Sequence, residues 1–179
     1  PILNFGSRPK EHYDRLEELF PGSPRMVMEM WNGMLDSTPY NYKMSTGKYV
    51  EVVNNGKYVG LYLLQRRIDG KYLELEDEIL LKGFKANAGS PIEDFFEIEY
   101  STYEGDKLWQ TLDGIYSLDS AQYINLENWI DVSLYIDLAY MADNSGRKNV
   151  FFIIENIETA PDIKMLLWDT DYAFGIGID

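Results

Sequence analysis

Hydrophobic residues recur at helical spacing in the first part of the chain. In residues 8–20 the apolar side chains predict a short amphipathic helix that ends before Pro21-Gly22: Tyr13, Leu16, Leu19 and Phe20. A second helix is predicted to begin with Ser23 as its N-cap and Pro24 at its first position. The apolar side chains of this helix fall on one side and are expected in the core: Met26, Met30, Trp31, Met34 and Leu35.

The pattern then changes to β-branched and aromatic runs. Two such runs flank Asn54-Asn55-Gly56, and they predict a hairpin with strands at 48–54 and 57–66. A third strand is predicted within 77–86 and a short helix over 108–116. The acidic segment 89–107 between them is expected to be irregular.

The last third begins with a longer predicted helix at 125–142. Asn125 can cap this helix, and its later face is nearly all apolar, so we expect it to be buried on most of its circumference. Strands at 149–156 and 163–171, joined by a turn at 160–162, then predict a second hairpin. This order of elements predicts an α+β fold in which antiparallel strands pack against helices.

Composition narrows the function classes. The 179 residues have 45% hydrophobic content, enough for one domain with a packed core, and a formal net charge of −14. That charge argues against nucleic acid as a partner, and no apolar run is long enough for membrane insertion. The chain has no cysteine and one histidine, His12, which we expect at a solvated helix position, so zinc–cysteine sites and a serine–histidine–aspartate triad are disfavoured.

Four oxygen-bearing side chains gather around the second predicted hairpin. Asp143 and Asn149 lie in the loop before its first strand, and Asp169 and Asp171 lie at the end of its second strand. If that end is extended, residues two apart share a face about 6.5–7 Å apart. Because their ligating atoms are hard oxygens, the set suits Mg²⁺ or Mn²⁺. The alternative is structural: the aspartates shape turns, or Arg147 and Lys148 supply the compensating charge.

The same spacing is the layout that phosphoryl transfer requires. One carboxylate orients the attacking hydroxyl, and an amide with a second carboxylate holds metal against the phosphates. Protein kinases place an Asp, an Asn a few residues later and an Asp at a hairpin end before a Phe-Gly pair; here the pair is Phe174-Gly175.

Three segments resemble successive landmarks of the spore coat protein H (CotH-type) kinase family: "VEVVNNGKYVGLYLLQRRID", "ENWIDVSLYIDLAYMADNSGRKNVFFI" and "MLLWDTDYAFG". The resemblance covers about Lys48 to Gly177. It implies an atypical protein-kinase-like domain that uses ATP and Mg²⁺ or Mn²⁺ to phosphorylate Ser/Thr hydroxyls of a coat or surface protein. It also implies a bacterial spore coat, cell-surface or secreted location.

The resemblance also implies roles for individual residues. Asp143 matches the catalytic aspartate, and Asn149 and Asp169 match metal-binding positions. Asp171 matches the second acidic position of the strand end, whose role is metal binding or structural. Lys82 matches a lysine that contacts the nucleotide phosphates. The chain departs from the family at Arg66, where a glutamate is usual. Residues 1–179 are expected to form a single domain that lacks N-terminal and C-terminal parts of the family fold. The competing hypothesis is a non-catalytic cell-surface module that binds carbohydrate or protein.

Overall fold

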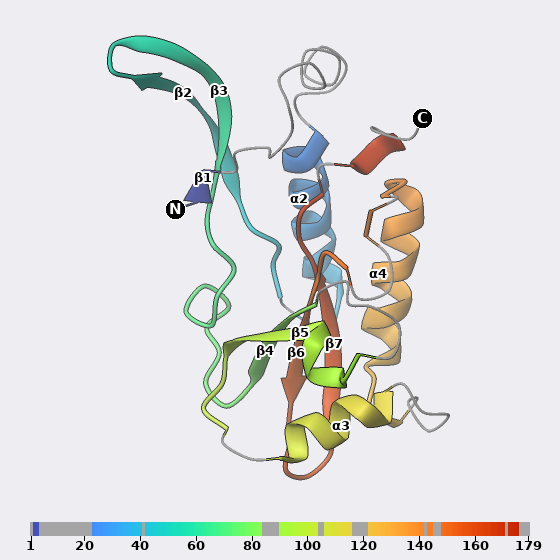
Figure 1. Ribbon diagram of the computed structural model, residues 1–179. Coiled ribbons are helices and arrows are strands. Elements are labelled where there is room, and N and C mark those ends of the chain that lie inside the picture. The colour runs from blue at the N-terminus through green and yellow to red at the C-terminus, as the bar shows by residue number, and fades with distance from the viewer. Residues whose placement is uncertain are drawn as a thin grey trace.

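The computed structural model describes residues 2–3, 23–40, 42–83, 90–103, 106–115, 122–141, 143–144, 148–170 and 172–175. Within these residues two antiparallel sheets pack with three α-helices and short 3-10 turns (Figure 1). The predicted α+β class is therefore confirmed. The predicted helix over 8–20 and His12 lie outside the described residues.

The first sheet is a three-stranded unit with the order β1-β3-β2. Its strands are β1 (Ile2–Leu3), β2 (Gly47–Asn54) and β3 (Lys57–Gln65). The β2–β3 hairpin is the predicted one, and Asn55 and Gly56 both adopt the positive φ, 50° and 76°, that a two-residue turn requires. The hairpin projects from the rest of the described structure (Figure 1).

The second sheet has the order β5-β4-β6-β7 and carries most of the core. Its strands are β4 (Ile79–Gly83), β5 (Phe96–Tyr100), β6 (Val150–Glu155) and β7 (Asp162–Leu167). Residues 150–154 and 163–167 are buried throughout, so β6 and β7 are covered on both faces. The predicted β6–β7 hairpin is confirmed, whereas the prediction of an irregular 89–107 is wrong because β5 forms there. Its acidic residues alternate with apolar ones, so strand pairing with β4 is compatible with their charge.

Two of the helices pack against each other beside this sheet. In α2 (Ser23–Met34), Trp31 packs against Tyr135 of α4 (Leu126–Leu138), with ring centroids 5.2 Å apart and the ring planes tilted by 58°. The Tyr135 hydroxyl also donates a 2.6 Å hydrogen bond to the Val27 carbonyl. The expectation that the whole apolar side of α2 is core is only partly right: Trp31 and Leu35 are buried, but the methionines at 26, 30 and 34 are about two-fifths exposed. The third helix, α3 (Lys107–Ile115), follows the prediction for 108–116 closely.

Side chains of α4 close the outer edge of β7. The fully buried Asn128 donates to the Met165 carbonyl and accepts from the Met165 N–H, at 3.2 and 2.6 Å. The Trp129 indole donates to the Ile163 carbonyl at 2.8 Å. Asn125 caps the helix by accepting from the Asn128 N–H, as predicted. Backbone groups that would otherwise leave an open sheet edge are therefore paired.

The prediction that α4 is buried on most of its circumference is wrong. Four apolar side chains on its outer face are between 48% and 68% exposed: Leu126, Ile130, Leu134 and Leu138. The buried arc of α4 faces β7 and α2, and no element of the described structure covers the opposite arc. Periodicity showed which positions are apolar, but it could not show how many neighbours the helix has.

The end of α4 turns the chain into the loop that carries Asp143. Tyr140 has a φ of 47°, its N–H bonds the Asp137 carbonyl, and the Met141 N–H bonds the Ile136 carbonyl. This pair of bonds is a Schellman termination, in which the left-handed residue is usually glycine. None of the helices in the described residues is long and apolar enough to cross a membrane.

Candidate functional site

The loop after α4 and the end of β7 lie side by side because of strand register. Val150 pairs with Leu167 at the open end of the β6–β7 hairpin. The residue before Val150 is Asn149, whose carbonyl accepts a 3.2 Å hydrogen bond from the Trp168 N–H. Asp169 therefore follows directly on a residue that is bonded to the loop. Of the predicted site residues, Asp143, Asn149 and Asp169 share this end of the sheet, and Asp171 lies outside the described residues.

Asn144 holds the loop against the β7 end. Its side chain is completely buried, and Nδ2 donates to the carbonyls of Asn149 and Trp168 at 3.0 and 2.9 Å. Its Oδ1 has no hydrogen-bond partner among the described residues. One amide group therefore connects the two segments that carry the candidate chemistry. Asn144 was not among the predicted site residues, and its only signal in the sequence is an Asp-Asn pair shortly after a long predicted helix.

The Asp143 carboxylate is bonded on both oxygens. Asn149 Nδ2 donates to Oδ2 at 3.1 Å, and the Lys148 ammonium pairs with Oδ1. The Lys148–Asp143 pair is partly exposed, with side-chain exposures of 40% and 34%, so solvent screens it and its contribution to stability is small. Lys148 thus fulfils the alternative expectation of a nearby counter-charge, while Arg147 lies outside the described residues.

Asp169 occupies an electrostatically unfavourable position. Burial raises the pKa of its carboxyl group, the Asp143 carboxylate raises it further, and the charges of Lys148 and Lys82 act in the opposite direction. The Lys148–Asp143 ion pair and the contact of Lys82 with the Trp168 ring place these charges around Asp169. Because the net pKa shift is upward, the two lysines do not fully compensate the burial and the like charge.

The backbone at Asp169 corrects one expectation. Strand β7 ends at Leu167, and Asp169 has a φ of 51° in the left-handed region, so the segment that begins there is not an extended strand end. Asn149 shares this conformation with a φ of 58°. Asp and Asn tolerate it better than other non-glycine residues, and such conformations cluster at functional sites.

Lys82 approaches the site from the neighbouring strand. It pairs with Phe151 in the β4–β6 register, and Phe151 pairs with Leu166 of β7. Its ammonium lies 4.3 Å from the centroid of the Trp168 ring, a cation–π contact next to Asp169. The structure therefore brings Lys82 to the same cluster as the three other described site residues.

The donor set is compatible with one hard cation. Among the described residues, no group of three or more His, Cys, Asp or Glu side chains is arranged to hold a metal. Mg²⁺, however, is commonly held by one or two protein carboxylates together with water and substrate phosphates. Asp143 and Asp169 supply two carboxylates, and the Nδ2 contact of Asn149 to Asp143 leaves its Oδ1 as a third possible oxygen ligand. The residues present therefore fit magnesium in the presence of a phosphate ligand.

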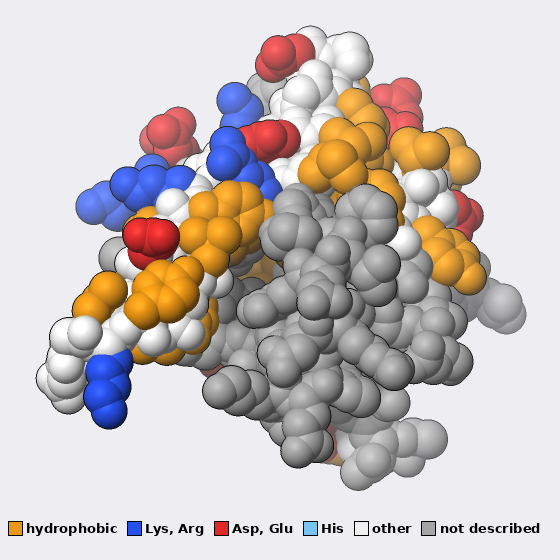
Figure 2. Space-filling model, turned by 90° about the horizontal axis from the view of Figure 1, so that it is seen from above, with side chains coloured by type: hydrophobic (Ala, Val, Ile, Leu, Met, Phe, Trp, Pro, Cys, Tyr) orange, Lys and Arg blue, Asp and Glu red, His pale blue; other side chains and the backbone are white. Residues whose placement is uncertain are grey.

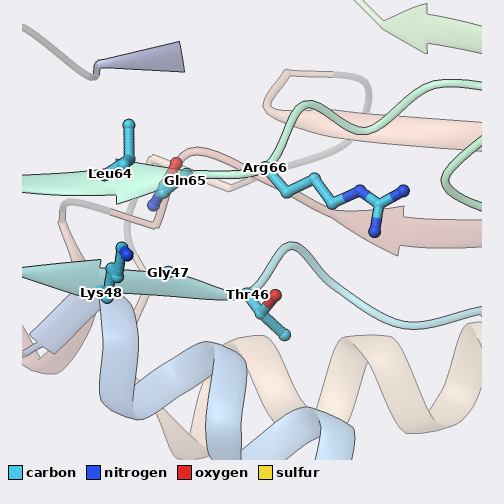
Figure 3. Close-up of a pocket in the computed structure, with 6 residues that line it drawn as sticks. All are labelled: Thr46, Gly47, Lys48, Leu64, Gln65 and Arg66. Carbon is cyan, nitrogen blue, oxygen red and sulfur yellow. The ribbon is translucent and has the colours of Figure 1, made fainter. Parts of the chain in front are cut away.

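Arg66 belongs to a separate hollow at the base of the β2–β3 hairpin. This hollow of about 530 Å³ is lined by residues from both strands and their extensions (Figure 3): Thr46, Gly47, Lys48, Leu64, Gln65 and Arg66. In Figure 3 the Arg66 side chain extends away from Lys48 and Leu64, and its guanidinium lies 5.0 Å from the Tyr72 ring centroid. Arg66 is exposed to solvent apart from this contact with Tyr72, and none of the acidic site residues lines the hollow.

Comparison of the chain with protein-family models finds no match, and comparison with curated proteins finds none either.

Proposed function

We propose that this chain is a phosphotransferase of the CotH type, which uses ATP and Mg²⁺ or Mn²⁺ to phosphorylate Ser/Thr hydroxyls of proteins. The observation that carries the proposal is the joint placement of Asp143, Asn149 and Asp169, with two lysines, at one end of the β6–β7 hairpin. Residues that lie far apart in sequence supply the types of group that phosphoryl transfer needs.

In this proposal Asp143 orients the acceptor hydroxyl and accepts its proton. The Asp143 carboxylate already accepts hydrogen bonds from Lys148 on one oxygen and from Asn149 on the other. An ionised carboxylate has about four lone-pair sites, so each oxygen can still accept a hydrogen bond from the acceptor hydroxyl. Asn149 then fixes the direction in which the carboxylate faces.

Asp169 and Asn149 are the proposed metal-binding residues, with Asp143 as their carboxylate neighbour. A bound divalent cation would neutralise charge on the phosphate oxygens and hold them against the acceptor. The raised pKa of Asp169 supports this role, because a cation at the site would offset both the burial and the repulsion from Asp143. Lys82 and Lys148 provide positive charge for the phosphates from two different elements.

The test is phosphotransfer from γ-labelled ATP to casein, as a generic acceptor, with MgCl₂ and with EDTA. Asp143→Asn and Asp169→Asn are each expected to lower the rate at least about 100-fold, the scale for removing a group that stabilises transition-state charge. Asp36→Asn, which changes an exposed acid outside the site, is the matched control and should retain the wild-type rate.

Thermal shift measurements with ATP separate binding from chemistry. ATP with Mg²⁺ should stabilise the wild-type chain, and Asp169→Asn should lose this stabilisation while remaining folded. If ATP and Mg²⁺ neither stabilise the protein nor support transfer to any acceptor, including itself, the proposal is wrong. If transfer occurs but Asp143→Asn and Asp169→Asn leave it unchanged, the site assignment is wrong.

A second candidate is a non-catalytic module that binds carbohydrate or protein. The observation that favours it is the exposed apolar surface of the projecting hairpin, where Val53, Tyr58 and Leu61 are all more than half exposed. Aromatic side chains that are open to solvent suit sugar and protein contacts. Binding on a glycan array that Tyr58→Ser abolishes and Asp169→Asn preserves would support this candidate over the kinase.

A further inference from the structure

The outer face of α4 carries a continuous apolar row. We call Leu126, Ile130, Leu134 and Leu138 the α4 ridge; their exposures are 61%, 48%, 61% and 68%. Tyr140, two residues after the end of the helix, is also 60% exposed. Viewed from above (Figure 2), hydrophobic side chains are exposed both on the side of the β2–β3 hairpin and on the side where Figure 1 places α4.

The spacing of the ridge is that of a helix-packing surface. Its members lie four residues apart, so they form one i±4n row, about 18 Å long at 1.5 Å per residue. Rows of this kind interlock with the same row on a second helix, at a crossing angle near −50°. The ridge therefore matches a helix whose own apolar residues repeat every four positions.

The charges around the ridge define the chemistry of that helix. All ionisable groups on α4 apart from Tyr135 are acidic, namely Glu127, Asp131 and Asp137. Glu127 and Asp137 are exposed beside the ridge, whereas Asp131 accepts a hydrogen bond from the Tyr40 hydroxyl. A second copy of the chain would bring these acids, and a formal charge of −14 on each copy, against one another. An anionic lipid surface is disfavoured for the same reason.

We propose that the α4 ridge is the docking site for a basic amphipathic helix of a partner protein. The apolar row of the partner packs on the α4 ridge, and Lys or Arg residues beside that row face Glu127 and Asp137. This inference does not depend on the proposed kinase activity, because none of the ridge residues belongs to the Asp143–Asp169 cluster.

Two labelled peptides of about 18 residues, long enough to span the ridge as a helix, test the proposal by fluorescence anisotropy. Both carry leucine at every fourth position; one has lysines beside the leucines and the other has glutamates. The lysine peptide should bind and weaken as salt is added, and the glutamate peptide should bind at least about tenfold more weakly. The double variant Leu134→Gln/Leu138→Gln should also weaken the lysine peptide at least about tenfold.

Ile98→Gln, at an apolar side chain on β5 that is 47% exposed, is the matched control and should bind as the wild type does. Circular dichroism checks that both variants fold, which is expected because the replaced side chains face solvent. The proposal is overturned if the lysine peptide does not bind, or if it binds the double variant as well as the wild type. Two other results also overturn it. One is a dimer in sedimentation experiments that the double variant abolishes, and the other is binding of phosphatidylglycerol vesicles that the double variant abolishes.

Discussion

Asn128 is the residue whose replacement most directly tests how α4 is attached to the sheet. Its side chain is 1% exposed and satisfies both the N–H and the carbonyl of Met165 on the outer edge of β7. Asn128→Leu preserves the approximate volume but leaves a buried donor and a buried acceptor unpaired. Each orphaned group costs about 1–3 kcal/mol, or about 4 kcal/mol for the two at mid-range.

Burial of the leucine offsets part of that cost. A fully buried leucine contributes about 1.5–3 kcal/mol relative to an exposed one, so a net loss of about 2 kcal/mol is expected for Asn128→Leu. For a domain of this length the corresponding fall in Tm is about 4–8 °C. Urea titration followed by circular dichroism measures the free energy of unfolding directly. Ser133→Ala on the same helix is the control. It loses an exposed hydrogen bond to the Trp129 carbonyl and should change the free energy of unfolding by less than about 0.5 kcal/mol.

Asn128→Asp makes the same test sensitive to pH. At neutral pH its carboxylate would be buried and would face the Met165 carbonyl, so this variant should be less stable than Asn128→Leu. A protonated aspartic acid both donates and accepts, so the deficit should shrink as the pH falls below neutrality. If Asn128→Leu is as stable as the wild type, then pairing of the β7 edge by Asn128 does not stabilise the fold and the reasoning is refuted.

Two further predictions concern Asp169, which follows β7, and Tyr140, which follows α4. Because the pKa of Asp169 is raised in the folded state, ionisation of this group reduces stability as the pH rises through its folded pKa. In metal-free buffer Asp169→Asn should therefore be more stable than the wild type at pH 7, and the difference in stability should vanish towards pH 4. Thermal melts across this pH range measure the difference, and a difference that does not depend on pH contradicts the prediction. Tyr140 has a left-handed backbone conformation at the end of α4, which glycine adopts without steric strain. Tyr140→Gly should therefore raise the free energy of unfolding by about 1 kcal/mol in a urea titration, whereas Tyr140→Ala should not.

Local pattern was sufficient for most elements because their signals are local. The Asn55-Gly56 turn and the two runs around it predicted the first hairpin, and the Asn125 cap predicted the start of α4. The strand β5 was missed although its glutamates alternate with apolar residues, because the run is short and acidic and pairs only with β4, at the edge of the sheet.

The candidate site could be predicted in part. Asp143, Asn149 and Asp169 stood out as residue types next to predicted strand ends, and Lys82 was named through the family resemblance. All four lie in one cluster. The roles of Asn144 and of Trp168 became visible only in three dimensions. The Asn144 side chain donates hydrogen bonds to the carbonyls of Asn149 and Trp168, which lie 5 and 24 residues away. The Trp168 ring makes a cation–π contact with Lys82 from another strand.

The amino-acid sequence by itself determined which residues are apolar, where the chain turns and which oxygen-bearing side chains follow the strands, because each of these depends on a few neighbouring residues. Only the tertiary structure decided how much of α4 is covered and which way Asp169 turns. Burial depends on the number of elements that reach a helix, and the pKa of Asp169 depends on its own burial and on charges from two other segments of the chain. These quantities are sums over long-range contacts, and no single stretch of sequence contains them.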